Sequence, residues 1–155
     1  MERKPIKREK SEFNEKVIDL RRVVRVVAGG KRFRFRATLV IGDEKGRIGI
    51  GVAKGADVQA AISKAKNQAK KSIIKINLLD NRTIHHEIEV KYGAARVLLK
   101  PASDGHGLKA GGSIRTVLSL AGVKDITAKA LSRTKNKLTN AKATIKALES
   151  IQSEK

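Results

Sequence analysis

The stretch that most constrains the fold is residues 28–41, where paired glycines are followed by a run in which arginine and apolar side chains alternate from Arg32 to Ala37. At the two-residue period of a strand, Phe33, Phe35, Ala37, Leu39 and Ile41 fall on one face, and Arg32, Arg34 and Arg36 fall on the other. Gly29 and Gly30 separate this run from a Val-rich run before it, and glycine supplies the positive φ angles of a tight hairpin turn. The pattern predicts a β-hairpin with a basic tip, one face packed on a core and the other turned toward anions.

The charge of the chain predicts a polyanionic partner. The 155 residues include 35 Lys and Arg against 15 Asp and Glu, which gives a formal net charge of +20. Such an excess opposes compaction unless a polyanion neutralises it, and nucleic acid is the leading candidate. An anionic membrane is the alternative that the sequence disfavours, because it shows no long apolar span, signal-like block or aromatic-edged amphipathic helix. We therefore expect no membrane partner.

Missing residue types narrow the chemistry further. The chain has no Cys, which excludes disulfides, thiol catalysis and Cys-ligated zinc, and which fits the cytoplasm. Aromatic residues make up only 3% of the chain, so binding cannot rest mainly on rows of platforms that stack single-stranded bases. Phosphate and shape contacts are left to supply most of the affinity.

The first half of the chain predicts a small sheet crossed by a helix. We expect a disordered basic arm over residues 1–12, then strands over 17–27, 32–41 and 47–53. In the third strand Ile48, Ile50 and Val52 are expected to face the core. Asp57 is a candidate N-cap for a helix whose apolar stripe runs from Val58 to Ile73. Three antiparallel strands and one helix would form a domain over residues 13–79.

The second half predicts a separate unit with the order β-β-α-β-α. The expected parts are a linker over 80–85, strands over 86–91, 96–100 and 123–131, a glycine-rich loop over 102–112 and a basic loop over 132–140. Ser113 is the candidate N-cap of a first helix, and a last helix should cover 141–151. Pro101 should end the second strand, and Gly122 the first helix. This domain would cover residues 86–152, followed by a tail over 153–155. The fold class is therefore α+β.

Two patterns that could signal other chemistry are weak. Glycines before the first helix suggest a phosphate-cradling loop, but a Walker loop needs Lys followed by Ser or Thr, and here Gly55 follows Lys54. We interpret these glycines as a flat strand against which another backbone, of protein or RNA, packs closely. His85 and His86 would point to opposite faces of a strand, so they cannot chelate one ion together. We expect no metal, no cofactor and no catalytic set.

Basic residues form the candidate RNA site. The concentration of Arg32, Arg34, Arg36 and Arg47 on one predicted sheet face, next to a glycine tip, exceeds what a merely solvated surface would show. Contacts of this kind position a protein on phosphates without reading sequence. The candidate RNA-binding residues are Arg21, Arg22, Arg25, Gly29, Gly30, Lys31, Arg32, Arg34, Arg36, Arg47, Lys54, Lys135 and Lys137.

Several segments together resemble one known family. Residues 26–35, 40–43, 46–51, 100–103 and 110–112 closely resemble the fifth protein of the small ribosomal subunit, bacterial type, and the likeness covers roughly residues 15–151. The resemblance implies a first domain akin to a double-stranded-RNA-binding domain and a second with a left-handed βαβ-type crossover. It also implies a structural, non-catalytic role in the small subunit of a cytoplasmic ribosome.

The resemblance further implies particular partners. These are small-subunit rRNA, mRNA near its entrance, and the small-subunit proteins numbered four and eight, with roles in assembly and decoding fidelity. It places the Gly29-Gly30-Lys31 tip in rRNA near the spectinomycin site. The protein-interface candidates are Ser103, Asp104, His106, Lys109 and Arg115. The chain departs from the family pattern at Asp104, His106 and Lys109, and Lys137 follows Asn136 where the family has proline.

Two other functional classes compete with this interpretation. One is a free-standing duplex-RNA-binding regulator or RNA chaperone, which would use the same basic surface outside the ribosome. The other is a nucleotide-dependent enzyme, which would bind ATP at the glycines of the third strand. The missing Walker residues make the second class the weaker of the two.

Overall fold

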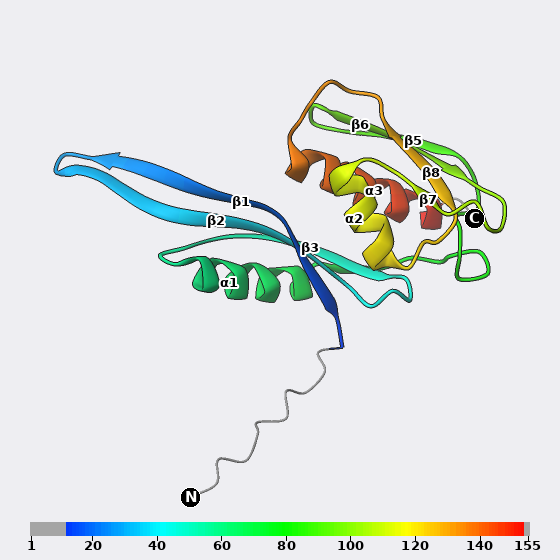
Figure 1. Ribbon diagram of the computed structural model, residues 1–155, viewed down its shortest axis with the longest axis horizontal. Helices are drawn as coiled ribbons and strands as arrows, with labels where there is room; N and C mark the ends of the chain where they lie inside the picture. The colour runs from blue at the N-terminus through cyan, green and yellow to red at the C-terminus, as the bar shows by residue number, and fades with distance from the viewer. Residues whose placement is uncertain (1–11, 154–155) are drawn as a thin grey trace, which may run out of the picture.

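A computed structural model describes residues 12–153 as two four-stranded sheets with three helices (Figure 1). The elements are β1 (Asn14–Val27), β2 (Gly30–Gly42), β3 (Arg47–Gly55), α1 (Val58–Lys71), β4 (Ile73–Lys75), β5 (Ile88–Tyr92), β6 (Ala95–Pro101), β7 (Leu108–Lys109), α2 (Gly112–Ala121), β8 (Ile126–Ala130) and α3 (Lys137–Ser153). The strand orders are β1-β2-β3-β4 and β5-β6-β8-β7. The predicted α+β class is confirmed.

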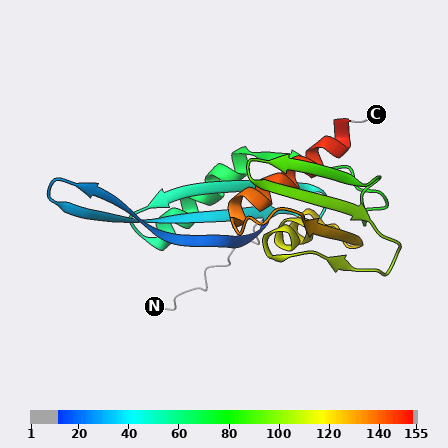
Figure 2. The same ribbon diagram turned by 90° about the horizontal axis from the view of Figure 1, so that it is seen from above.

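The predicted hairpin is present and longer than expected. β1 and β2 pair antiparallel from Asn14 opposite Gly42 to Val27 opposite Gly30, which leaves Ala28 and Gly29 as the turn. Its outer part extends well beyond the rest of the molecule as a two-stranded arm (Figures 1 and 2). The expectation of a three-stranded sheet was wrong, because β4 adds a fourth strand beside β3. β4 is only three residues long and follows α1 closely, so Ile73 fitted the helical stripe equally well.

Helix α1 packs on one face of this sheet. Ala37, Leu39 and Ile41 of β2 form a cluster with Ala61, Ala65 and Ala69 of the helix, and all six are fully buried. The helix lies so close to β3 that a Cβ at Gly51 would stand 2.0 Å from the Ala65 carbonyl oxygen. This confirms that the glycines of the third strand mark a close backbone approach, and the approaching backbone is that of α1.

The opposite face of the sheet is covered by the C-terminal half. Val40 and Ile48 are fully buried in a cluster that also contains Leu99 and Leu118, and Ile50 packs against it. Ile48 and Ile50 therefore face a core, but not the core under α1 that the alternation predicted. The anion-facing side predicted for β2 is also shorter than expected, because its inner part is buried at Val40. Figure 1 shows the sheet between α1 and the C-terminal half.

The C-terminal half contains one strand more than expected. β7 lies inside the predicted glycine-rich loop and pairs parallel with β8, so β7, α2 and β8 form a crossover unit. α2 begins at Gly112, with Gly111 rather than Ser113 as its N-cap. Gly122 ends that helix at φ 88°, as predicted. α3 starts at Lys137, within the segment expected to be a basic loop.

The connection between the halves is packed into the structure. Ile84 is fully buried in the shared cluster, and the Arg82 carbonyl oxygen accepts hydrogen bonds from the amides of Lys124 and Asp125. The predicted arm over residues 1–12 lies outside the described residues except for Glu12, and the tail over 153–155 except for Ser153. No helix within residues 12–153 has the length and apolarity needed to cross a membrane.

Candidate nucleic-acid interface

The strand register gathers six basic side chains on one side of the N-terminal sheet. Arg25 stands opposite Arg32, Arg21 opposite Arg36, and Arg36 opposite Lys54. Residues directly opposite one another in an antiparallel pair point to the same face. We call Arg21, Arg25, Arg32, Arg34, Arg36 and Lys54 the cationic face.

Like charges directly opposite each other on paired strands repel and destabilise the pairing, so the cationic face is stabilised by nearby anions. At the end of the cationic face farthest from the hairpin tip, one carboxylate reduces this repulsion. The Asp19 Oδ2 atom is 2.7 Å from Arg21 Nε and 3.9 Å from Arg36 Nη2. Toward the tip, within residues 12–153, no carboxylate lies within ion-pair distance of Arg25, Arg32, Arg34 or Lys54. The outer cationic face, formed by these four side chains, therefore carries uncompensated positive charge.

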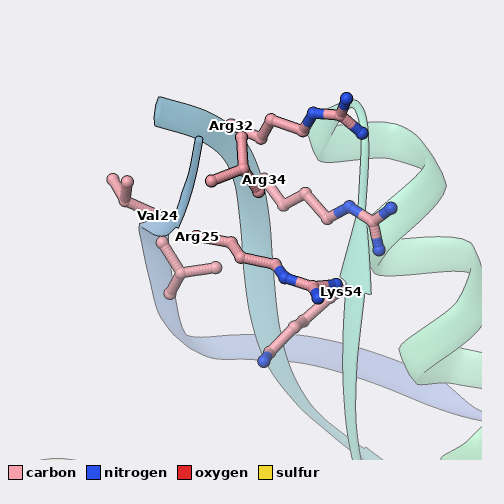
Figure 3. Close-up of a pocket in the computed structure, with 7 residues that line it drawn as sticks. Val24, Arg25, Arg32, Arg34 and Lys54 are labelled. Carbon is pink, nitrogen blue, oxygen red and sulfur yellow. The ribbon is translucent and has the colours of Figure 1, made fainter. Parts of the chain in front are cut away.

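These four side chains surround a hollow of about 410 Å³ between the arm and the end of β3. Arg25, Arg32 and Arg34 extend from the hairpin in one direction, toward the strand that carries Lys54, while Val24 points away from them (Figure 3). Guanidinium groups donate several hydrogen bonds in a fixed planar geometry that matches phosphate oxygens. The hollow can therefore hold a phosphate backbone between several donors.

The hairpin tip differs slightly from its prediction. Gly30 has a φ of 123°, but Gly29 is not among the residues with positive φ, so only one of the two glycines supplies the left-handed conformation. Lys31 stands opposite Val26, and Arg22 opposite Phe35. Lys31 and Arg22 therefore lie on the face that α1 packs against, not on the cationic face. The predicted RNA-binding residues of the arm thus divide between its two faces.

Arg47 was wrongly assigned to the arginine face. It lies at the opposite end of β3 from Lys54 and on the other side of the sheet. Its Nε atom donates to Asp43 Oδ2 at 2.6 Å, its Nη2 atom donates to Glu12 Oε1 at 2.6 Å, and its guanidinium lies over the Phe13 ring. Burial opposes ionisation of Asp43, but hydrogen bonds from the Arg47 side chain and backbone hold the pKa of this carboxyl below its usual value. Arg47 is thus neutralised within the protein.

Two further candidates come from the C-terminal half. Lys135 and Lys137 are exposed at the start of α3, a helix that contacts β1. In Figure 1 this end of α3 lies above the stem of the hairpin, on the same side of the sheet as the C-terminal half. Arg133 in the preceding loop is also exposed, and sequence reasoning missed it. The only signal for Arg133 was its place within the segment predicted as a basic loop.

The predicted protein-interface residues gather around β7 and the start of α2. Asp104 forms an ion pair with Arg82, and His106 Nε2 lies 3.2 Å from Thr127 Oγ1. Ser103 accepts a backbone hydrogen bond from His106. Lys109 lies opposite Thr127 in the β7–β8 ladder, and Arg115 lies in the first turn of α2. The structure therefore places Ser103, Asp104, His106 and Lys109 in or just before β7, with Arg115 on the helix that follows.

Arg82 ties this region to the core of the second half. Its Nε atom donates to Asp125 Oδ2 at 2.9 Å, and the Gly107 amide donates to Asp125 Oδ1 at 2.9 Å. The Gly107 hydrogen bond, opposed by burial and assisted by Arg82, lowers the pKa of Asp125 from its ordinary value. Within the part of the chain that the structure describes, no group of three or more His, Cys, Asp or Glu residues could hold a metal ion.

Comparison with known proteins decides the family. Residues 13–77 match the family described as "Ribosomal protein S5, N-terminal domain", and residues 90–155 match "Ribosomal protein S5, C-terminal domain". The chain belongs to the ribosomal protein S5 family. Its members are structural, non-enzymatic proteins of the ribosome, so the predicted family is confirmed and the nucleotide-dependent enzyme is excluded.

Individual relatives agree over most of their length. The small ribosomal subunit protein uS5c of Cyanidium caldarium is 49% identical over 141 residues, covering 91% of this chain and 83% of that protein. The uS5c protein of Gracilaria tenuistipitata var. liui is 49% identical over 154 residues, covering 98% of this chain and 89% of that protein. The small ribosomal subunit protein uS5 of Campylobacter jejuni subsp. jejuni is 48% identical over 139 residues, covering 90% of this chain and 93% of that protein.

Proposed function

We propose that this ribosomal protein binds small-subunit rRNA through the cationic face and the Gly29-Gly30-Lys31 tip, and that this binding helps the subunit assemble. The observation that carries the proposal is the outer cationic face, where Arg25, Arg32, Arg34 and Lys54 have no carboxylate partner within residues 12–153. RNA phosphates are the anions that a ribosomal protein meets at high density. The names of its relatives place them in the small subunit.

The fold supports this role mechanically. α1 packs on one face of the N-terminal sheet and the C-terminal half packs on the other face, so the base of the arm is held on both sides. The arm itself projects beyond these layers, where both of its faces are open to a partner. A projecting ribbon with a charged face can enter a crevice in folded RNA while the rest of the protein anchors it outside.

The salt dependence of RNA binding tests this assignment. Replacing Arg25, Arg32, Arg34 and Lys54 together with Ala should flatten the slope of log K against log salt by roughly 0.7 to 0.9 for each phosphate that the protein no longer neutralises. A matched control removes the same charge from exposed lysines of the C-terminal half, namely Lys91, Lys124, Lys129 and Lys146. The control should retain a steeper slope. Equal slopes in the two quadruple variants would refute the assignment of this face.

We extend the proposal to the mRNA entrance, to translational accuracy, and to contacts with the small-subunit proteins numbered four and eight. A protein contact is supported by the exposure of all five predicted interface residues in one short part of the chain, in or just before β7 and in the first turn of α2, namely Ser103, Asp104, His106, Lys109 and Arg115. A crosslinker placed at Lys109 in assembled subunits should capture protein four or eight. If it captured only rRNA, this part of the proposal would fail.

The hairpin tip provides a separate test in cells. We expect deletion of Lys31 or replacement of Gly30 to alter subunit assembly, spectinomycin sensitivity or growth in the cold, because the turn conformation depends on Gly30. If all three remained unaltered, the tip would have no such role. Sedimentation distinguishes the remaining alternative, because a free-standing RNA regulator would remain mostly outside the small subunits.

A further inference from the structure

The second face of the hairpin arm exposes several large apolar side chains beside Arg22 and Lys31. Leu20, Val24, Val26 and Phe33 are 44%, 48%, 73% and 46% exposed, and we call these four residues the apolar strip. Val24 stands directly opposite Phe33, and Val26 opposite Lys31, so the strip lies on the face away from Arg32 and Arg34. Phe35, further in on the same face, packs against the cluster under α1, but that cluster does not extend to the strip. Val24 and Phe33 form a directly opposed exposed pair with Val26 two residues nearer the tip, and exposed apolar side chains grouped in this way indicate a binding surface.

The charge around the strip selects its partner. Residues 20–36 contain no Asp or Glu, and both faces of the arm carry arginine or lysine. The arm is only one ribbon thick, so any molecule that covers the strip also lies within the field of the cationic face. A second copy of this chain, with a net charge of +20, would be repelled. An RNA strand satisfies both requirements, because it brings phosphates for the charges and base faces for the apolar atoms.

One contact on the strip is already arranged for a base. The Cζ atom of Arg22 lies 3.7 Å from the centre of the Phe33 ring, and both side chains are exposed. Unpaired RNA bases stack on aromatic rings and on guanidinium planes. In a continuous duplex the base faces already stack on one another and cannot reach such a platform. The pair therefore suits a base in a loop, bulge or strand end.

We propose that the arm binds irregular RNA on both faces at once, with phosphates on the cationic face and an unpaired base stacked on Arg22 and Phe33. This inference rests on the proposed RNA-binding function and names the kind of RNA that the arm selects. The aliphatic side chains of Val24 and Val26 would pack beside the base or its ribose. Binding would then have a salt-dependent part from the phosphate contacts and a salt-independent part from stacking of the base.

The test compares two RNA hairpins with the full chain. One has a fully paired stem, and the other has the same stem with a single bulged 2-aminopurine. The double variant Arg22→Lys with Phe33→Leu keeps the charge and the apolar character but removes both planar groups. We expect it to bind the bulged RNA about tenfold more weakly than the unaltered chain does, with the same salt slope, and to lose quenching of the 2-aminopurine fluorescence. Its affinity for the paired stem should not change.

A second variant separates the two faces. Arg25→Ala with Arg34→Ala should weaken binding to both RNAs and flatten both salt slopes while 2-aminopurine quenching persists at saturation. The inference is overturned if the Arg22 and Phe33 variant weakens both RNAs equally or retains the quenching, and the strip would then be left to a protein partner. If the unaltered chain bound neither RNA, the proposed function itself would fail. Because all four side chains are exposed, unchanged urea midpoints are expected for both variants.

Discussion

At the tip of the hairpin, two adjacent glycines have different conformations. Gly30 has a φ of 123°, a backbone conformation that residues with a side chain rarely adopt, whereas Gly29 is not among the residues with positive φ. An added Cβ would have open space at both positions, so the difference lies in the backbone. Gly30→Ala should therefore destabilise the turn by about 1 kcal/mol or more, and Gly29→Ala should be close to neutral. Hydrogen exchange of the Val26 and Val27 amides measures the difference. Equal exchange in both variants would contradict the expected strain at Gly30.

Asp125 should make the stability of the C-terminal half depend on pH. The folded-state pKa of Asp125 lies below the ordinary carboxyl value of about 4. The ionised carboxylate therefore stabilises the folded protein fully above about pH 4, and this stabilisation is lost as the pH falls through the folded-state pKa. Asp125→Asn should lower the free energy of unfolding at pH 7 and make it less dependent on pH below about 4. Urea unfolding from pH 7 to pH 3 measures both effects. Asp104→Asn is the control, since the Asp104 side chain is 76% exposed.

At the scale of single elements, the contact of α1 with β3 depends on glycine. A Cβ at Gly51 would lie 2.0 Å from the Ala65 carbonyl oxygen and 2.7 Å from the Ala69 amide nitrogen, and both atoms belong to the helix backbone. The helix must move to admit it, so Gly51→Ala should destabilise the protein by about 3 kcal/mol. Gly112→Ala is the matched control, because nothing lies near its added Cβ. Thermal unfolding compares the two, and a Gly51→Ala variant as stable as the control would contradict this packing.

The same element shows where sequence patterns succeed and where they fail. Alternation placed Leu39 and Ile41 on the face under α1, because that face is apolar throughout. In β3 both faces are buried, one by α1 and one by the C-terminal half, so the bulky Ile48 and Ile50 gave no signal for which core they enter. Arg47 was misplaced for the same reason, since reversing the faces of β3 moves every one of its side chains to the other side.

Across the whole molecule, contacts between distant segments decided what the sequence could not. Alternation had already placed Arg32 and Arg34 on one face, but only the register of β1 against β2 adds Arg25 to that face. β7 escaped prediction because a two-residue strand has no period of its own and exists through its pairing with β8. The apolar strip escaped because its residues look like core residues in the sequence, and only their exposure in the arm distinguishes them.

The two halves share one core and should unfold together. Val40 of β2 is fully buried in the same cluster as Leu99 and Leu118 of the C-terminal half. The turn after β2 adds backbone hydrogen bonds, from Glu44 N to Leu120 O at 3.1 Å and from Gly46 N to Ala121 O at 3.0 Å. Disrupted packing in the N-terminal sheet should therefore reach α2 directly, so we expect one cooperative unfolding transition.

Val40→Ala tests this coupling. The variant should lower the free energy of unfolding by about 2 kcal/mol, because it leaves a cavity between the halves. Hydrogen exchange should then accelerate in β6 and β8 as well as in β2 and β3, since all four strands border one cooperative core. Val24→Ala makes the same chemical change on the exposed arm and should leave both sheets protected. If protection fell in the N-terminal sheet alone, the halves would be separate folding units joined by a contact, and the arm would be anchored by α1 without help from the C-terminal half.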